Sequence, residues 1–275
     1  MSTELFGPGS ASRLTAVALG LAALLYAALL ALLWFGQERL IFLPTPLPAN
    51  HALAREPDVH ERFVEVDGAR LSVLELRLPD PKGVVFFLHG NAGNLASWFV
   101  NADFYRRTGF DLVMLDYRGY GKSSGRIGSE AQLHADVRAV WAEVAPRYAG
   151  RRVVLYGRSL GTALAASLAA DVQPDLTVLV SPYTSMAAMA REHYPWVPAA
   201  LLRYPLRTGD HLARVRSPVL LLHGDRDELI PLAHSHALRS AAPHARLHVV
   251  PGGGHNDLQE SESYLGALRA ALASL

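Results

Sequence analysis

Residues 153–161 read Val-Val-Leu-Tyr-Gly-Arg-Ser-Leu-Gly, and an alanine-rich stretch follows them at 162–170. The apolar run at the start predicts a buried strand, and the alanine-rich stretch predicts a helix. Between them, the pattern G-x-S-x-G lets the backbone turn so sharply that the hydroxyl of Ser159 stands clear of the sheet. The serine also lies at a helix N-terminus, where partial positive charge stabilises an anion. This arrangement predicts Ser159 as a catalytic nucleophile.

A serine hydroxyl is a weak nucleophile, so the hypothesis requires a base and an acid that orients the base. Both residue types follow later apolar runs: Asp227 comes after 219–222, and His255 comes after 247–250. Because open α/β sheets carry their sites at the carboxyl ends of the strands, these side chains are expected to converge on Ser159. We therefore expect His255 as the base and Asp227 as its acid.

Plainer interpretations of these two loops stay open. Three acids crowd between Asp225 and Glu228, so Asp225 is the main rival for the role of the acid. Asp225 and Glu228 are equally suited to cap the following helix. A histidine that follows three glycines, as His255 does, is more often an ordinary surface residue.

The third requirement is a pair of N–H donors for the negative charge that develops on the attacked carbonyl. The segment 89–94 (His-Gly-Asn-Ala-Gly-Asn) follows the apolar run 84–88, where such a loop belongs. We expect the backbone N–H of Asn91 to act together with that of Leu160, with Ala92 as the alternative donor. The plainer interpretation is a glycine-rich turn into a helix near Leu95.

Strand-like and helical patterns alternate along the rest of the chain from about Arg62. Two runs, 63–66 and 71–78, are separated by Asp67-Gly68 and predict an antiparallel hairpin. The later runs are continuously apolar, as parallel strands covered on both faces are. They lie at 84–88, 112–115, 153–156, 176–180, 219–222 and 247–250. This alternation predicts an α/β fold with a mostly parallel sheet flanked by helices.

The segment 14–35 contains no charged side chain, and as a helix it spans roughly 33 Å, enough for a hydrocarbon core of about 30 Å. Trp34 and Phe35 suit the aromatic belt of a membrane interface. We therefore predict a single transmembrane helix, with a cleaved signal peptide or a buried core helix as alternatives. Arg13 and the amino terminus lie on one side and Arg39 and Arg55 on the other, so the positive-inside count is nearly tied; we expect a cytoplasmic N-terminus and an extracytoplasmic globular part.

These features divide the chain into a tail (1–13), the membrane helix (14–35), a linker (36–60) and one α/β domain (61–275). Within the domain, residues 181–217 separate two predicted strands and are expected to form a short helical lid. Its methionines and aromatic residues suit an acyl chain or a membrane-facing rim. Ordinary packing of two short helices explains them equally well.

Composition excludes several other classes of protein. The formal net charge of +1 gives no field that would attract nucleic acid. The chain contains no cysteine, so a disulfide, a thiol nucleophile and a cysteine zinc site are all excluded. His234 and His236 have no supporting cluster of ligands in the sequence, and we expect neither a metal nor an organic cofactor.

Taken together and in order, these motifs resemble the α/β-hydrolase superfamily, in which the triad follows the chain order Ser, Asp, His. They look most similar to the Bem46-like branch of single-span serine hydrolases, which includes the α/β-hydrolase domain-containing proteins 13 and 17. The resemblance covers residues 37–275 and rests on QERLIFLPTP, LHGNAGN, LDYRGYGKSSG, YGRSLG, SPYTS, HGDRDELIP and GGGHND. It implies the α/β-hydrolase fold, with Ser159, Asp227 and His255 in the triad roles. Depalmitoylating relatives carry an acylated, cysteine-rich tail, and that targeting mode does not transfer to a chain without cysteine.

The expected function is that of a membrane-anchored serine hydrolase acting on carboxylic esters or thioesters of small-molecule or lipid-like acyl substrates. An acyltransferase with the same triad is one alternative, because only the acceptor of the acyl group differs. A catalytically silent, membrane-tethered binding protein is the rival from another class. The presence of Ser159, Asp227 and His255 argues against it.

Overall fold

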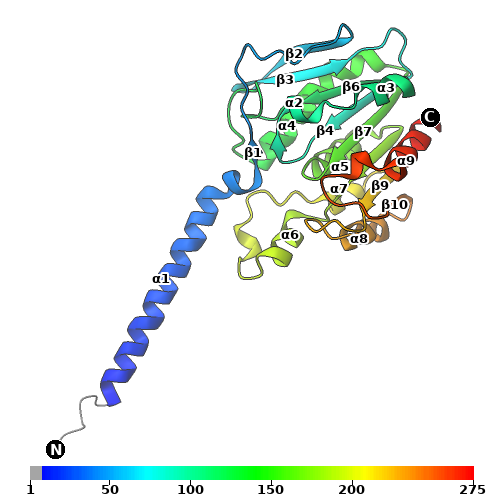
Figure 1. Ribbon diagram of the computed structural model, residues 1–275. Helices are drawn as coiled ribbons and strands as arrows, with labels where there is room; N and C mark the ends of the chain where they lie inside the picture. The colour runs from blue at the N-terminus through cyan, green and yellow to red at the C-terminus, as the bar shows by residue number, and fades with distance from the viewer. Residues whose placement is uncertain (1–7) are drawn as a thin grey trace, which may run out of the picture.

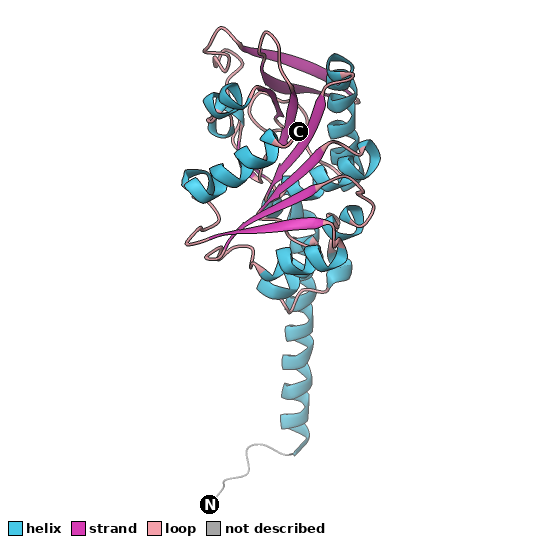
Figure 2. Cartoon of the chain, turned by 90° about the vertical axis from the view of Figure 1, so that its right-hand side faces the viewer, coloured by secondary structure: helices cyan, strands magenta, loops and turns pink. Residues whose placement is uncertain are grey.

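The computed structural model describes residues 8–275, and its centre is one twisted sheet between two layers of helices (Figures 1 and 2). The eight strands of this sheet are β2 (Val59–Val66), β3 (Ala69–Leu76), β4 (Gly83–Leu88), β6 (Phe110–Leu115), β7 (Arg152–Arg158), β8 (Leu176–Val180), β9 (Val219–Gly224) and β10 (Ala245–Val250). Their order across the sheet is β10-β9-β8-β7-β4-β6-β3-β2. Only the pairs β6–β3 and β3–β2 are antiparallel, so the predicted mostly parallel sheet is confirmed.

The first two strands of this sheet form the predicted hairpin. Val66 pairs with Ala69, which leaves Asp67-Gly68 as a two-residue turn. Gly68 has φ 70°, a left-handed conformation that glycine adopts without steric cost.

Each face of the sheet carries its own hydrophobic core, which explains why the central strands are continuously apolar. In β4, for example, Val84 and Phe86 face one core, whereas Val85 and Phe87 face the other. The first core is covered by α4 (Glu130–Val144), α5 (Gly161–Val172), α7 (Thr208–Leu212) and α8 (Ala233–Ala241). The second is covered by α2 (Leu95–Trp98), α3 (Ala102–Thr108) and α9 (Glu262–Ala273).

One buried carboxylate on the sheet is surrounded by positive charge. Glu75 of β3 is fully buried, and Arg62, Arg77 and Arg147 each lie within 2.7 Å of its oxygens. Burial opposes ionisation of this side chain, but the three arginines outweigh it and lower the pKa of Glu75 from 4.5 to about 2. This cluster fixes the antiparallel edge of the sheet.

The N-terminal helix α1 (Pro8–Ile41) projects from the globular part as a single rod (Figure 1). Its segment Ser12–Ile41 is long and apolar enough to cross a membrane. The helix extends beyond both ends of the predicted 14–35 span. It includes the end of the predicted tail, of which residues 1–7 lie outside the described part of the chain.

At its other end α1 continues for six residues into the predicted linker. Residues 36–41 contain no proline, and the helix ends before Pro44, which cannot continue one. The chain then forms the short strand β1 (Leu43–Pro44), which pairs with β5 (Ala92–Gly93) in the loop after β4. The base of α1 is therefore attached to the loop in which an oxyanion donor is expected.

The segment between β8 and β9, residues 181–217, contains the predicted short helices. It holds α6 (Met186–His193), the single 3₁₀ turn η2 (Ala199–Leu201) and α7. We call this segment the insert. Figure 1 shows it on the side of the globular part from which α1 leaves.

Candidate active site

The turn between β7 and α5 holds Ser159 in an unusual conformation. Its φ is 50°, in the left-handed region, which costs an ordinary residue of the L series roughly 1–2 kcal/mol. Both flanking glycines are required by close packing. A Cβ at Gly161 would lie 2.0 Å from the carbonyl oxygen of Leu88, and one at Gly157 would lie 2.4 Å from that of Gly161. The G-x-S-x-G pattern is thus the set of residues that allows this tight strand-to-helix turn.

The three residues predicted to form a triad lie together at the carboxyl ends of their strands. Ser159 follows β7, Asp227 follows β9, and His255 follows β10. His255 Nδ1 lies 2.8 Å from Asp227 Oδ2, and His255 Nε2 lies 3.1 Å from Ser159 Oγ. In this geometry the imidazole donates from Nδ1 to the carboxylate and accepts at Nε2 from the hydroxyl. The arrangement can deprotonate the serine as it attacks.

The carboxylate of Asp227 is buried but well supplied with donors. Its Oδ1 accepts from the backbone N–H groups of Leu229 and Ile230, at 3.1 and 2.8 Å. His223 Nε2 lies 3.4 Å from Oδ2. Burial opposes ionisation, but hydrogen bonds from His223, His255 and Ile230 outweigh it and hold the pKa of this carboxyl well below its usual value. Asp227 is therefore an anion over the whole physiological range.

The rival acid Asp225 points elsewhere. It is exposed, and its Oδ1 accepts from the N–H of Gly252 at 2.7 Å. This bond ties the loop after β9 to the loop after β10. Asp225 therefore holds together the two loops that carry Asp227 and His255.

The expected oxyanion donors flank Ser159. Leu160 is the next residue in the chain after Ser159. Asn91 follows Gly90, and Gly90 lies so close to the serine that a Cβ added to it would be 3.6 Å from the Cβ of Ser159. Within residues 8–275, neither the N–H of Asn91 nor that of Leu160 donates to a carbonyl or a side chain. The alternative donor, Ala92, belongs to β5. Two free amides beside the serine suit stabilisation of an oxyanion.

The loop that carries Asn91 is fastened from several directions. The carbonyl oxygen of Asn91 accepts from the N–H of Leu43 at 2.8 Å and from the hydroxyl of Tyr120 at 2.6 Å. Below it, the buried His89 ring lies 4.3 Å from the ring of Tyr117, and its Nε2 is 3.5 Å from Asp116. These contacts hold the free N–H of the loop in place.

Sequence reasoning missed a role for Arg158, the variable residue before the nucleophile. Its guanidinium donates to His255 O at 2.9 Å and to Gln259 Oε1 at 2.6 Å, and it lies over the ring of Trp98. Arg158 is 92% buried, so it is a structural tie between the elbow and the loop of His255. The only sequence signal was a charged residue at the end of an apolar strand.

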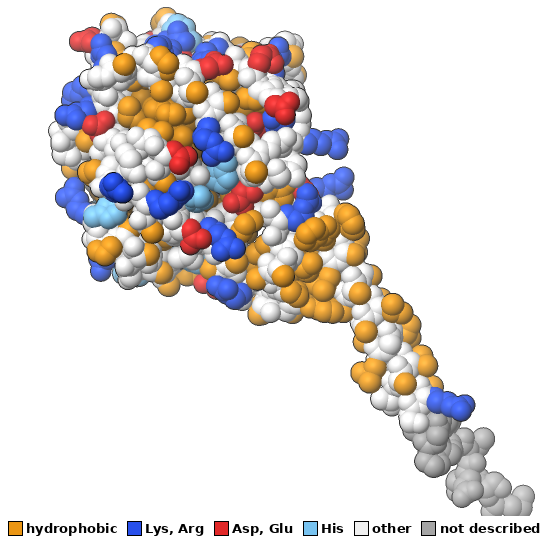
Figure 3. Space-filling model, turned by 180° about the vertical axis from the view of Figure 1, so that it is seen from behind, with side chains coloured by type: hydrophobic (Ala, Val, Ile, Leu, Met, Phe, Trp, Pro, Cys, Tyr) orange, Lys and Arg blue, Asp and Glu red, His pale blue; other side chains and the backbone are white. Residues whose placement is uncertain are grey.

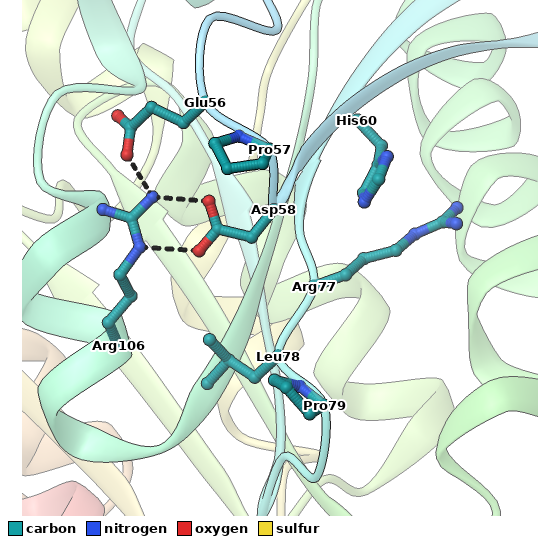
Figure 4. Close-up of a pocket in the computed structure, with 8 residues that line it drawn as sticks. All are labelled: Glu56, Pro57, Asp58, His60, Arg77, Leu78, Pro79 and Arg106. Atoms are coloured by element: carbon teal, nitrogen blue, oxygen red, sulfur yellow. Dashed lines mark hydrogen bonds and ion pairs between the residues drawn. The ribbon is translucent and has the colours of Figure 1, made fainter.

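A separate hollow lies at the antiparallel edge of the sheet (Figure 4). Its charges are engaged: Arg106 forms ion pairs with Glu56 and Asp58. None of Ser159, Asp227 and His255 lines it. In the part of the chain that the structure describes, no group of three or more potential metal ligands gathers here or elsewhere.

The chain is also similar in sequence to a protein family and to individual proteins. Residues 79–209 match the family described as serine aminopeptidase, S33. An uncharacterized protein of Mycobacterium tuberculosis is 35% identical over 263 residues, covering 91% of this chain and 92% of its own. The human α/β hydrolase domain-containing protein 17B is 34% identical over 226 residues, covering 78% of this chain and 76% of its own.

The fold is also similar to that of solved structures. The Pyrococcus furiosus esterase Pf2001 superimposes with a TM-score of 0.67 at 18% sequence identity. The match covers 85% of this chain and 97% of the esterase.

Proposed function

The chain belongs to the α/β-hydrolase family, in the branch of α/β hydrolase domain-containing protein 17, and from this premise we propose that it is a membrane-anchored serine hydrolase of carboxylic esters or thioesters. Ser159 is the nucleophile, His255 the general base and Asp227 the acid that orients it. The observation that supports these roles is the unbroken pair of hydrogen bonds from Asp227 through His255 to Ser159.

The reaction proceeds through an acyl-enzyme. Ser159 Oγ attacks the substrate carbonyl carbon while His255 Nε2 takes the hydroxyl proton. The carbonyl oxygen becomes negatively charged and is stabilised by the N–H groups of Asn91 and Leu160. When the tetrahedral intermediate collapses, the bond to the alcohol or thiol breaks, and His255 returns the proton to that leaving group. Water then attacks the acyl carbon while His255 Nε2 takes one of its protons; the bond to Ser159 Oγ breaks, the carboxylic acid is released, and His255 returns the proton to Ser159.

Asp227 and the two amides contribute to different parts of the barrier. Because Asp227 remains ionised, it favours the Nδ1–H tautomer and stabilises the imidazolium that forms during attack. Each oxyanion donor lowers the barrier in proportion to the charge on the oxygen, and loss of one donor typically costs about 10²–10³ in kcat. No metal or organic cofactor enters any of these steps.

The membrane enters the proposal through α1. Residues 14–35 form the span, the preceding residues the tail, and residues 61–275 the catalytic domain with the insert as its lid. The substrate is a small-molecule or lipid-like acyl compound. We further propose that the catalytic domain lies on the extracytoplasmic side, with Arg13 before the span and Arg39 after it.

The proposal is tested with matched octanoyl substrates: a p-nitrophenyl ester, a thioester and a p-nitroanilide. We expect the detergent-solubilised full chain to cleave the ester and the thioester, and Ser159→Ala to lose at least about 10³-fold in kcat. Ser181→Ala is the matched control. Ser181 is another buried serine with a left-handed backbone (φ 46°), at the end of the adjacent strand. Hydrolysis that survives in Ser159→Ala, or that is confined to the anilide, contradicts the proposal.

A further inference from the structure

The insert exposes an apolar segment that the chemistry above does not use. Residues 194–202 read Tyr-Pro-Trp-Val-Pro-Ala-Ala-Leu-Leu, with no charged side chain between His193 and Arg203. Tyr194 is 58% exposed and Trp196 is 46% exposed. We call residues 194–202 the apolar tip. A contiguous exposed apolar segment of this kind marks a surface that is covered by a partner.

The apolar tip is attached to the candidate membrane span. The hydroxyl of Tyr26 donates to Trp196 O at 2.8 Å, although the two residues are 170 positions apart in the chain. Nearer the base of α1, Gln37 Nε2 donates to Leu201 O at 2.9 Å. Tyr26 lies in the C-terminal half of the apolar stretch 14–35, so Trp196 lies alongside the stretch rather than beyond its end.

The polar residues that border the tip mark the level of an interface. Arg203 forms an ion pair with Glu38 of α1 at 2.6 Å, and its guanidinium also lies 5.8 Å from the ring centroid of Trp34. Tyr204 donates to Glu38 Oε1 at 2.8 Å. Charged and aromatic groups thus gather at one height on α1, as at a membrane–water boundary, while the apolar tip extends below it.

The tip is also adjacent to the candidate active site. His193, at the end of α6, donates from Nε2 to the carbonyl of Leu229 at 3.1 Å. Leu229 is 50% exposed, and its N–H donates to Asp227 Oδ1. Tyr194, which follows His193, is also exposed, so an exposed apolar side chain lies on each side of this hydrogen bond; we call Tyr194 and Leu229 the rim. Figure 3 shows hydrophobic side chains gathered where the globular part meets α1.

We propose that the apolar tip inserts into the acyl-chain region of a lipid bilayer beside α1, so that membrane-borne acyl substrates reach Ser159 along the rim formed by Tyr194 and Leu229. The proposal rests on the membrane anchoring proposed above. A bilayer is favoured over a second protein because the tip is fixed to α1, a helix that is itself suited to be surrounded by lipid. The exposed apolar surface of the tip is therefore continuous with the apolar surface of the span.

The absence of cysteine makes insertion directly measurable, because single-cysteine variants are labelled at one site. The full chain is labelled with an environment-sensitive NBD dye at Ala200→Cys in the tip, at Leu25→Cys in the span, or at Ala149→Cys. Ala149 is an exposed alanine in the turn before β7, at the end of that strand opposite Ser159. Each protein is reconstituted into phosphatidylcholine vesicles with and without lipids that carry a nitroxide quencher on the acyl chain.

We expect the Ala200 dye to be quenched at every ratio of protein to lipid, though less strongly than the Leu25 dye because Leu201 beside it bonds Gln37 near the boundary, and we expect the Ala149 dye to be unaffected. An Ala200 dye that behaves like the Ala149 dye while the Leu25 dye is quenched overturns the inference and leaves the anchor intact. If the Ala200 dye is shielded from water only at a high ratio of protein to lipid, a second copy of the chain is the occupant of the tip, and this result also overturns the inference. An unquenched Leu25 dye removes the anchor itself.

A second measurement connects insertion to substrate delivery. Trp196→Ser is expected to lower the ratio of turnover of vesicle-borne long-chain esters to turnover of a soluble short-chain ester by about tenfold. Phe63→Ser is the matched control, because Phe63 is an exposed aromatic residue on the far edge strand β2. An unchanged ratio in Trp196→Ser contradicts delivery along the rim, whatever the absolute rates.

Discussion

Replacing Asp227 with asparagine keeps the shape of the side chain but changes which of its atoms accept hydrogen bonds. In the structure, Oδ1 accepts from the N–H groups of Leu229 and Ile230, and Oδ2 accepts from His255 Nδ1. An asparagine has only one oxygen for these two positions. The question is which position that oxygen takes.

The two backbone donors decide the orientation. If the amide oxygen faces them, both hydrogen bonds are kept; if the NH₂ faces them, both are lost at about 1 kcal/mol each, and two donors are brought together. The oxygen therefore stays on that side in more than about nine molecules in ten. The NH₂ is then directed at His255 Nδ1, which must accept, so that the proton moves to Nε2. A protonated Nε2 cannot take the proton of Ser159.

The expected result of Asp227→Asn is a fall in kcat of about 10³–10⁴, or roughly 4–5.5 kcal/mol of barrier, with KM little changed. The assay is steady-state hydrolysis of p-nitrophenyl butyrate by the detergent-solubilised chain. Asp225→Asn is the control, because Asp225 bonds Gly252 and not the imidazole; its rate should stay within about tenfold of wild type. If Asp227→Asn also stays within that limit, the tautomer argument is refuted.

Three further predictions concern the scaffold. Glu75→Gln should lower the free energy of unfolding by about 3 kcal/mol at neutral pH, because the pKa of Glu75 is about 2 in the folded chain and 4.5 in the unfolded chain. This stabilisation is complete above pH 4.5 and is lost as the pH falls through 2. Denaturant titrations across that pH range test the prediction. Gly161→Ala should cost at least about 3 kcal/mol in the same titration, through the clash with Leu88, whereas Gly266→Ala, with open space around it, should be neutral or stabilising. Arg158→Met should lower kcat about tenfold or more without raising KM, since the loop of the base loses its tie; equal kcat values would contradict this.

The parts of the molecule that were predictable are those fixed by local pattern. Strands covered on both faces must be apolar throughout, so their positions follow from short apolar runs such as 84–88 and 176–180. The elbow is likewise legible, because Gly157 and Gly161 are needed by close packing of the backbone. Residues that follow such strands lie at one edge of a parallel sheet, which is why the order of Ser159, Asp227 and His255 in the chain was informative.

What was missed depends on contacts between distant parts of the chain. Arg158 reaches Gln259 across 101 positions, and Gln37 of α1 reaches Leu201 across 164. A polar side chain carries no sequence signal for a partner so far away, and the predicted linker therefore gave no indication that α1 would continue and hold the insert. The approach of His223 to Asp227 is a different case: the two residues are neighbours in the chain, and it is the turn after β9 that brings their side chains together.

The measurement that tests the central claim most directly is the site of covalent modification. The full chain in mild detergent is treated with a fluorophosphonate, which reacts with an activated serine, and the digested protein is analysed by peptide mass spectrometry. We predict one phosphonate per chain, on Ser159, with labelling abolished in Ser159→Ala, strongly reduced in His255→Ala and Asp227→Ala, and retained in Asp225→Ala. Phosphonate on another residue, or a folded wild-type chain that remains unlabelled, would contradict the assignment of Ser159 as the nucleophile.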